Sequence, residues 1–114
     1  MPGDFEMSGE KETEIRRMMQ QFEHQITEMN STEITRRAGD IKKDDFLNLA
    51  KSISILRANY LKDVLIIARA NEDKLSINLC LEARKARIAY EEAVESFDQL
   101  KHALQRGYFN LVDD

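Results

Sequence analysis

Apolar residues recur at alternating steps of three and four along most of this chain. In the first third they are Ile15, Met19, Phe22, Ile26 and Met29. These steps put all five on one face of an α-helix, which is typical of a coiled-coil seam. We call this set the N-terminal seam. It predicts a helix over about residues 9–38, which the stretch MNSTE at residues 29–33 would fray or break. The preceding residues 1–8 hold the only proline and are expected to form a disordered lead.

A second helix is predicted over about residues 40–70, restarting after Gly39. Its apolar face covers about half of the helix circumference, which indicates packing by more than one neighbour. Arg57 falls inside this face, so its guanidinium must either reach water along its own stem or meet a carboxylate. The face consists of Phe46, Leu49, Ala50, Ile53, Leu56, Tyr60, Leu61, Val64, Leu65, Ile67 and Ala68.

A third helix is predicted over about residues 73–106, after a turn near residues 71–72. Nothing in the stretch NEDK excludes one continuous helix, so this boundary stays open. The apolar positions keep alternating steps of four and three at Leu79, Ala83, Ala86, Tyr90, Ala93, Phe97, Leu100 and Leu104. A period of 3.5 residues held this long predicts a coiled-coil-like crossing of long helices. Gly107 ends the helix, and the apolar tail over residues 107–114 could fold back.

Together these elements predict an all-α protein of three long helices. We expect an antiparallel helical hairpin with the N-terminal helix packed alongside, in a single domain over residues 9–114. Four glycines and one proline among 114 residues favour helices over sheets with tight turns. Residues 34–71 hold eight bases and four acids, between two segments in which acids outnumber bases. A basic middle helix between acidic neighbours fits this arrangement.

Five apolar residues fall outside the main faces of the second and third helices. On the third helix, Ile77, Leu81 and Ile88 form a stripe of their own. If the hairpin turns near residues 71–72, Ile55 lies level with Ile88, and Ile66 with Ile77. An ordered set of exposed apolar side chains indicates a binding surface, so these are the candidate partner-binding residues. Either the N-terminal helix and the tail cover them within one chain, or a second copy or another helical protein does. We call Ile55, Ile66, Ile77, Leu81 and Ile88 the outer set.

Catalytic motifs are missing from the sequence, which has no phosphate-binding loop, Cys-x-x-Cys, His-Glu-x-x-His or nucleophile elbow. His24 and His102 both fall outside the apolar faces. Glu28, four residues after His24, would repel a phosphoryl group, which speaks against a phosphotransfer role. Asp98 and His102 share a helix face, but no second cluster supplies further metal ligands. We therefore expect no enzyme activity, no catalytic residues, no metal site and no cofactor.

Nucleic-acid binding is the alternative that the charges suggest. Arg36, Arg37, Lys42 and Lys43 flank Gly39 and could hold phosphates. Three aspartates interrupt this basic cluster, no aromatic residues are interleaved with it, and the net charge of the chain is -4. We therefore prefer the interpretation without a binding role, in which these bases form a charged rim around a helix–helix loop.

The expected function is that of a non-enzymatic helical protein–protein interaction module, which acts as an adaptor, regulator or chaperone. It would bind another protein through helix packing and would also self-associate, with a dimer favoured. Cys80 has no partner for an internal disulfide and is expected to be a small core or boundary residue in a reducing compartment. The acidic start lacks the features of a secretory signal, and no apolar run is long enough to span a membrane. We therefore expect a cytoplasmic protein that does not bind membranes.

Overall fold

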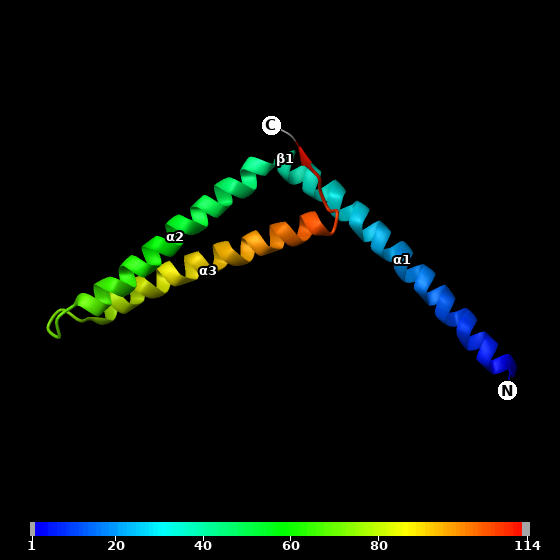
Figure 1. The fold of residues 1–114 in the computed structure, drawn as a ribbon, viewed down its shortest axis with the longest axis horizontal. Coiled ribbons are helices and arrows are strands. Elements are labelled where there is room, and N and C mark those ends of the chain that lie inside the picture. The colour runs from blue at the N-terminus through cyan, green and yellow to red at the C-terminus, as the bar shows by residue number, and fades with distance from the viewer. Residues whose placement is uncertain (1, 113–114) are drawn as a thin grey trace.

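The computed structural model describes residues 2–112, with the side chains of residues 9–112. Three helices account for most of the chain: α1 (Pro2–Ala38), α2 (Lys43–Arg69) and α3 (Ile77–Gln105). Two short strands, β1 (Ile41–Lys42) and β2 (Leu111–Val112), complete the fold. The all-α class and the hairpin of two long helices are thereby confirmed (Figure 1). The disordered lead predicted over residues 1–8 lies outside the residues whose side chains are described.

The hairpin is made by α2 and α3, which pack against each other along their length. At the start of α2, the Lys42 backbone N–H donates to the Asp45 carboxylate at 2.8 Å and satisfies an amide that the helix cannot. The turn between the helices spans residues 70–76, longer than the tight turn expected near residues 71–72. Ser76 caps α3, because its hydroxyl accepts the backbone N–H of Leu79 at 3.3 Å.

The core lies in the hairpin and at its open end. Phe46 meets the edge of Phe97 at a centroid distance of 5.8 Å and lies beside Phe109 at 6.3 Å. Nearer the turn, Tyr60 stacks on Tyr90. The eight apolar positions predicted for α3 are all partly or fully buried, so the predicted face is confirmed.

Arg57 lies against an aromatic ring and not against a carboxylate. Its guanidinium sits 5.2 Å from the centre of the Tyr90 ring, and its Nε donates to the Tyr90 hydroxyl at 3.2 Å. The residue is exposed, so its charge stays in water while its stem follows the hairpin. The first of the two expected solutions is therefore the one observed.

The chain after α3 folds back as the apolar tail suggested. Gly107 adopts a φ of +77°, a left-handed conformation that glycine reaches without steric cost, and it turns the chain out of the helix. Phe109 is then buried, and β2 pairs in parallel with β1. The tail therefore joins the open end of the hairpin to the junction between α1 and α2.

The N-terminal helix α1 is continuous through the MNSTE stretch and extends away from the hairpin (Figure 1). It meets the rest of the protein near its C-terminal end, where Ile34 and Ala38 line a hollow with Leu100 and Phe109. Most of its length therefore does not lie alongside the hairpin, and the molecule is elongated, with extents of 81 × 45 × 17 Å.

Candidate interaction surface

All five residues of the outer set are exposed in the structure. Ile77 is 78% exposed, and the other four lie between 44% and 53%. Neither α1 nor the tail covers them, because α1 leads away and the tail packs at the other end of the hairpin (Figure 1). Of the two accounts left open by the sequence, coverage within one chain is therefore excluded for the described residues.

The outer set does not form one continuous surface. Val64 and Ile67 of α2 line a hollow with Cys80 and Ala83 of α3, which places Ile66 level with Leu81. The expected pairing of Ile66 with Ile77 is wrong by about one helical turn, because the connection spans residues 70–76 and not only residues 71–72. Helical geometry also puts Leu81 and the neighbouring stripe residues opposite the buried Ala83 face, on the back of α3.

Two apolar surfaces result. The first is the stripe on the back of α3, formed by Ile77, Leu81 and Ile88, which we call the α3 stripe. The second is a groove of about 820 Å³ on the outer side of α2, beside the hairpin turn. We call it the tip groove, and it is lined by Ala58, Leu61, Lys62, Leu65, Ile66, Arg69, Ala70, Asn71, Lys74 and Leu79.

The tip groove exists because α2 is apolar over a wider arc than α3 covers. Leu61 and Leu65, predicted to be packed as part of the main face, are 51% and 44% exposed. The prediction that they are packed is wrong for the single chain, since α2 has one helical neighbour along this stretch instead of two. The excess width of the apolar face was the sequence signal for this surface.

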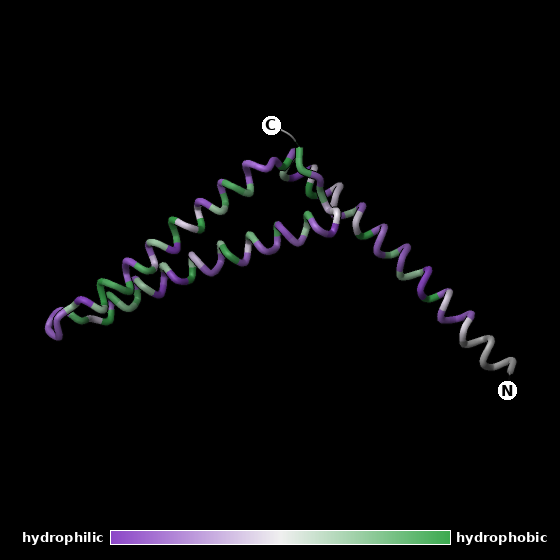
Figure 2. Tube along the Cα trace, in the orientation of Figure 1, coloured by the Kyte–Doolittle hydropathy of each residue, from purple (hydrophilic) through white to green (hydrophobic). Residues whose placement is uncertain are grey.

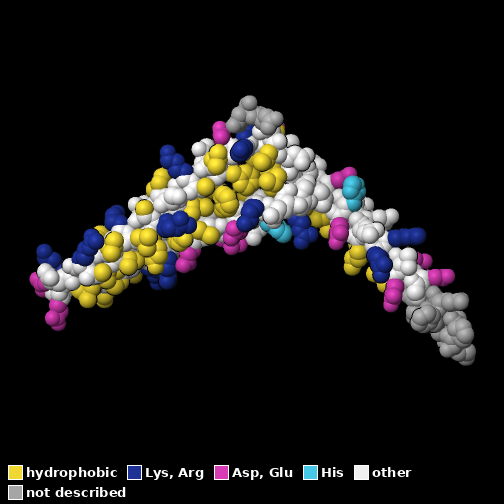
Figure 3. All heavy atoms as spheres, in the orientation of Figure 1, with side chains coloured by type: hydrophobic (Ala, Val, Ile, Leu, Met, Phe, Trp, Pro, Cys, Tyr) yellow, Lys and Arg dark blue, Asp and Glu magenta, His cyan; other side chains and the backbone are white. Residues whose placement is uncertain are grey.

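Basic side chains rim the tip groove. Lys62, Arg69 and Lys74 are among its lining residues, which include no acidic residue. Lys62 is only loosely matched by its neighbour Asp63, at 4.0 Å. Figure 3 shows hydrophobic side chains gathered on the hairpin near its tip, with lysines and arginines beside them. The groove therefore combines an apolar floor with a positive edge.

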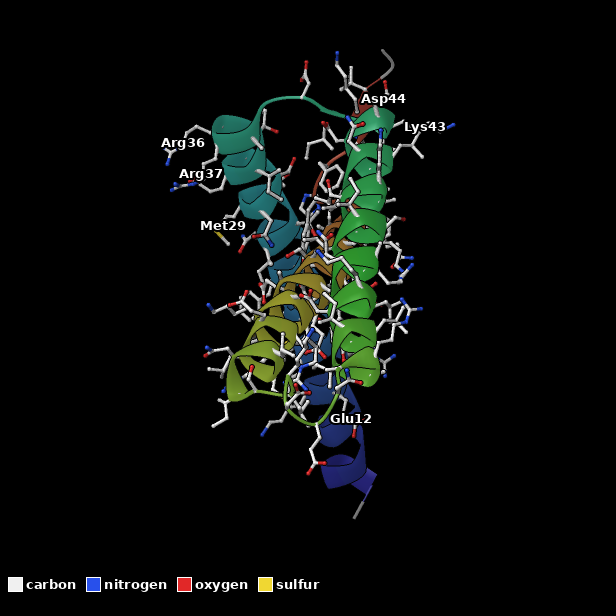
Figure 4. The ribbon with its side chains drawn as sticks, turned by 90° about the vertical axis from the view of Figure 1, so that its left-hand side faces the viewer. Glu12, Met29, Arg36, Arg37, Lys43 and Asp44 are labelled. Carbon is white, nitrogen blue, oxygen red and sulfur yellow. The ribbon has the colours of Figure 1, made fainter. Side chains whose placement is uncertain are left out.

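The basic cluster around Gly39 is divided by the fold. Arg36 and Arg37 both lie against the Glu33 carboxylate, at 3.1 and 3.3 Å. These two arginines extend to one side of the molecule, whereas Lys43 extends to the other (Figure 4). Lys42 belongs to β1, between the two helices. The structure therefore does not bring the four bases together into one phosphate-binding patch.

The side chains that could take part in catalysis or metal binding do not cluster among the described residues. His24 lies 3.1 Å from Glu28 on the open surface of α1, and Asp98 pairs with Lys101 at 3.7 Å. Among residues 9–112, no group of three His, Cys, Asp or Glu side chains is placed to hold a metal ion. Cys80 is exposed at the rim of a hollow between α2 and α3, so the expectation of a core position is wrong and that of a boundary position fits. Within residues 2–112, no helix is both long and apolar enough to cross a membrane.

Comparison with known families, curated proteins and solved structures found no match for this chain.

Proposed function

We propose that this protein is a non-enzymatic helical interaction module that receives an amphipathic helix of another protein in the tip groove. An adaptor, regulator or chaperone role would use such a surface. The observation that carries the proposal is the uncovered width of α2, where Leu61 and Leu65 remain exposed beside a basic rim. Isolated exposed leucines are ordinary, but an apolar groove of this size beside a hairpin turn is a typical helix-binding surface.

The positive charge of the basic rim favours a partner with negative charge. With Lys62, Arg69 and Lys74 at the edge and no acid in the lining, a helix with acidic flanks would gain favourable charge contacts. A helix with basic flanks and the same apolar face would meet like charges. We therefore propose an acidic amphipathic helix as the partner.

Self-association, with a dimer as the simplest assembly, belongs to the same proposal. An exposed thiol at Cys80 suits a reducing compartment such as the cytoplasm. Nucleic-acid binding by Arg36, Arg37, Lys42 and Lys43 has weaker support, because Glu33 engages both arginines and Lys43 extends to the opposite side.

The proposal is tested with two designed helical peptides that share one apolar face and carry either glutamates or lysines beside it. In fluorescence anisotropy, the acidic peptide is expected to bind the full chain, and the basic peptide is not. Leu65→Ser with Ile66→Ser should weaken binding of the acidic peptide by at least about tenfold, since two half-buried apolar contacts are lost.

The matched control is Leu47→Ser, which removes a leucine that is 57% exposed near the other end of α2. This variant should bind the acidic peptide as the parent does. Equal binding of both peptides, or unchanged binding by the Leu65 and Ile66 double variant, would remove the tip groove as the site.

A further inference from the structure

The N-terminal seam is fully uncovered in the single chain. Its five residues and the adjacent Met18 are between 46% and 59% exposed. From Gly9 to Ile26 every residue of α1 is exposed. Helices in proteins owe most of their stability to packing of an apolar face, so α1 is expected to have another helix against it. Figure 2 shows apolar positions recurring along α1 as they do along the hairpin.

The hairpin does not supply that helix, because it contacts a different face of α1. Within residues 9–38, the partly covered positions are Thr27, Asn30, Ser31 and Ile34. On a helical wheel this face lies about a third of a turn from the N-terminal seam. Met29 extends away from α2, on the same side as Arg36 and Arg37 (Figure 4). The N-terminal seam is therefore open to a second molecule.

The residues along the seam favour a reversed copy of α1 as the occupant. Continued at the same spacing, the core positions run from Glu12 to Arg36, and their spacing is symmetric about His24. In an antiparallel pair Phe22 faces Ile26 of the second copy, Met19 faces Met29, and Ile15 faces Glu33. The eight positions are Glu12, Ile15, Met19, Phe22, Ile26, Met29, Glu33 and Arg36.

Charge favours the antiparallel arrangement over a parallel one. A parallel pair in register would stack Glu12 on Glu12, Glu33 on Glu33 and Arg36 on Arg36 in the core layers, where like charges repel. The antiparallel pair instead sets Glu12 against Arg36 of the second copy at both ends. In the single chain Arg36 has only an exposed contact with Glu33, which costs little to give up.

The buried area suffices for a specific dimer. If each of the six half-exposed side chains contributes on the order of 100 Å², two copies bury roughly 1,200 Å², the lower limit for stable interfaces. The stems of flanking residues add to this. We infer that α1 forms an antiparallel two-stranded coiled coil with α1 of a second copy, which places the two hairpins at opposite ends of the dimer. This inference rests on the proposed self-association and assigns it a surface separate from the tip groove.

The first experiment measures mass in solution by light scattering. The full chain should have twice its mass of 13.3 kDa, and Phe22→Ser with Ile26→Ser should be monomeric. The matched control, Ile77→Ser with Leu81→Ser, removes two exposed apolar residues from α3 and should stay dimeric. A monomeric parent, or a dimer that survives the Phe22 and Ile26 changes, would overturn the inference.

The second experiment determines orientation and does not depend on how those variants fold. In a Cys80→Ser background, Gln25→Cys lies beside its own copy at the centre of an antiparallel pair and should react with a short thiol crosslinker. Glu12→Cys should not, because the two copies of residue 12 lie about 36 Å apart in that arrangement. Crosslinking of Glu12→Cys, or none for Gln25→Cys, would overturn the antiparallel pairing.

The third experiment exchanges the end charges. Glu12→Arg alone should raise the dimer dissociation constant by about tenfold, since it sets arginine against Arg36 at both ends. Adding Arg36→Glu should restore most of the affinity. A double variant weaker than the single one would contradict the pairing of these layers. A monomeric parent that still binds the acidic peptide would overturn this inference and leave the tip groove in place.

Discussion

The hairpin and α1 use the same spacing of apolar residues with opposite outcomes. In α3 the alternating steps of four and three produce a row that is buried against α2, with Ala83 only 7% exposed. In α1 the same steps produce a row in which Phe22 remains 48% exposed. The difference between the two helices lies in how the chain connects each of them to α2. A short turn holds α2 and α3 antiparallel, whereas Gly39, with a φ of +71°, directs α1 away from both.

Burial of an apolar row depends on two separate things, the spacing of its residues and the presence of a neighbouring helix. Its spacing decides that a helix will be buried on one face, but the position of the chain decides whether the neighbour belongs to the same molecule. For α3 both requirements are met within one chain. For α1 only the first is met, so its core is completed by a second copy under the inference above.

The largest difference in the free energy of unfolding is expected between alanine substitutions of two phenylalanines. Phe97→Ala should destabilise the hairpin by about 2–4 kcal/mol, because it removes a half-buried ring that contacts Phe46. Phe22→Ala should cost less than about 0.5 kcal/mol when measured below the concentration at which the protein dimerises. Urea unfolding of both variants checks this. Similar costs under dilute conditions would show that α1 has a neighbour within the single chain.

A smaller effect on stability is expected from substitutions in the α3 stripe, on the outside of the hairpin. Ile77→Ser with Leu81→Ser and Ile88→Ser should change the free energy of unfolding by less than about 1 kcal/mol, because all three side chains are exposed. Circular dichroism should show an intact helical protein with a cooperative melt. The same variant should lose any partner that docks on the α3 stripe. If it is unfolded, the stripe belongs to the core of the single chain after all.

The smallest effect is expected at Arg57. Its contacts with Tyr90 are exposed, so Arg57→Leu should alter the free energy of unfolding by less than about 0.5 kcal/mol. Thermal melting with Lys51→Leu as the surface control checks this. A cost above about 2 kcal/mol would reveal an acidic partner left uncompensated by the change.

The sequence predicted the fold where spacing alone was sufficient. The face of α3 was predicted position by position, and the limits of the three helices were close to those observed from Ala38 onward. The face of α2 was predicted too wide for one neighbour, and Leu61 and Leu65 are exposed as a result. A helical wheel counts the side chains that can be buried, but it does not count the helices available to bury them.

The candidate surface was predicted less completely. Exposure of the outer set was foreseen as one alternative, but its division between α2 and the back of α3 depends on the length of the turn. Because the connection spans residues 70–76, Ile66 lies level with Leu81, about one helical turn along α3 from Ile77. The basic rim of the tip groove combines Lys62 and Arg69 of α2 with Lys74 of the turn. Only the folded turn brings Lys74 to that edge.

The joint at Gly39 also makes α1 a lever. About 43 Å of helix separates Ala38 from Gly9 at 1.5 Å per residue, so a rotation of roughly 10° at the joint moves the far end by about 8 Å. Few contacts hold this joint in place. β1 and β2 pair over two residues, and Ile34 and Ala38 lie beside Phe109. In the proposed dimer, a substitution that tilts α1 slightly at this joint would therefore shift the distance between the two hairpins by many times the displacement at its own position.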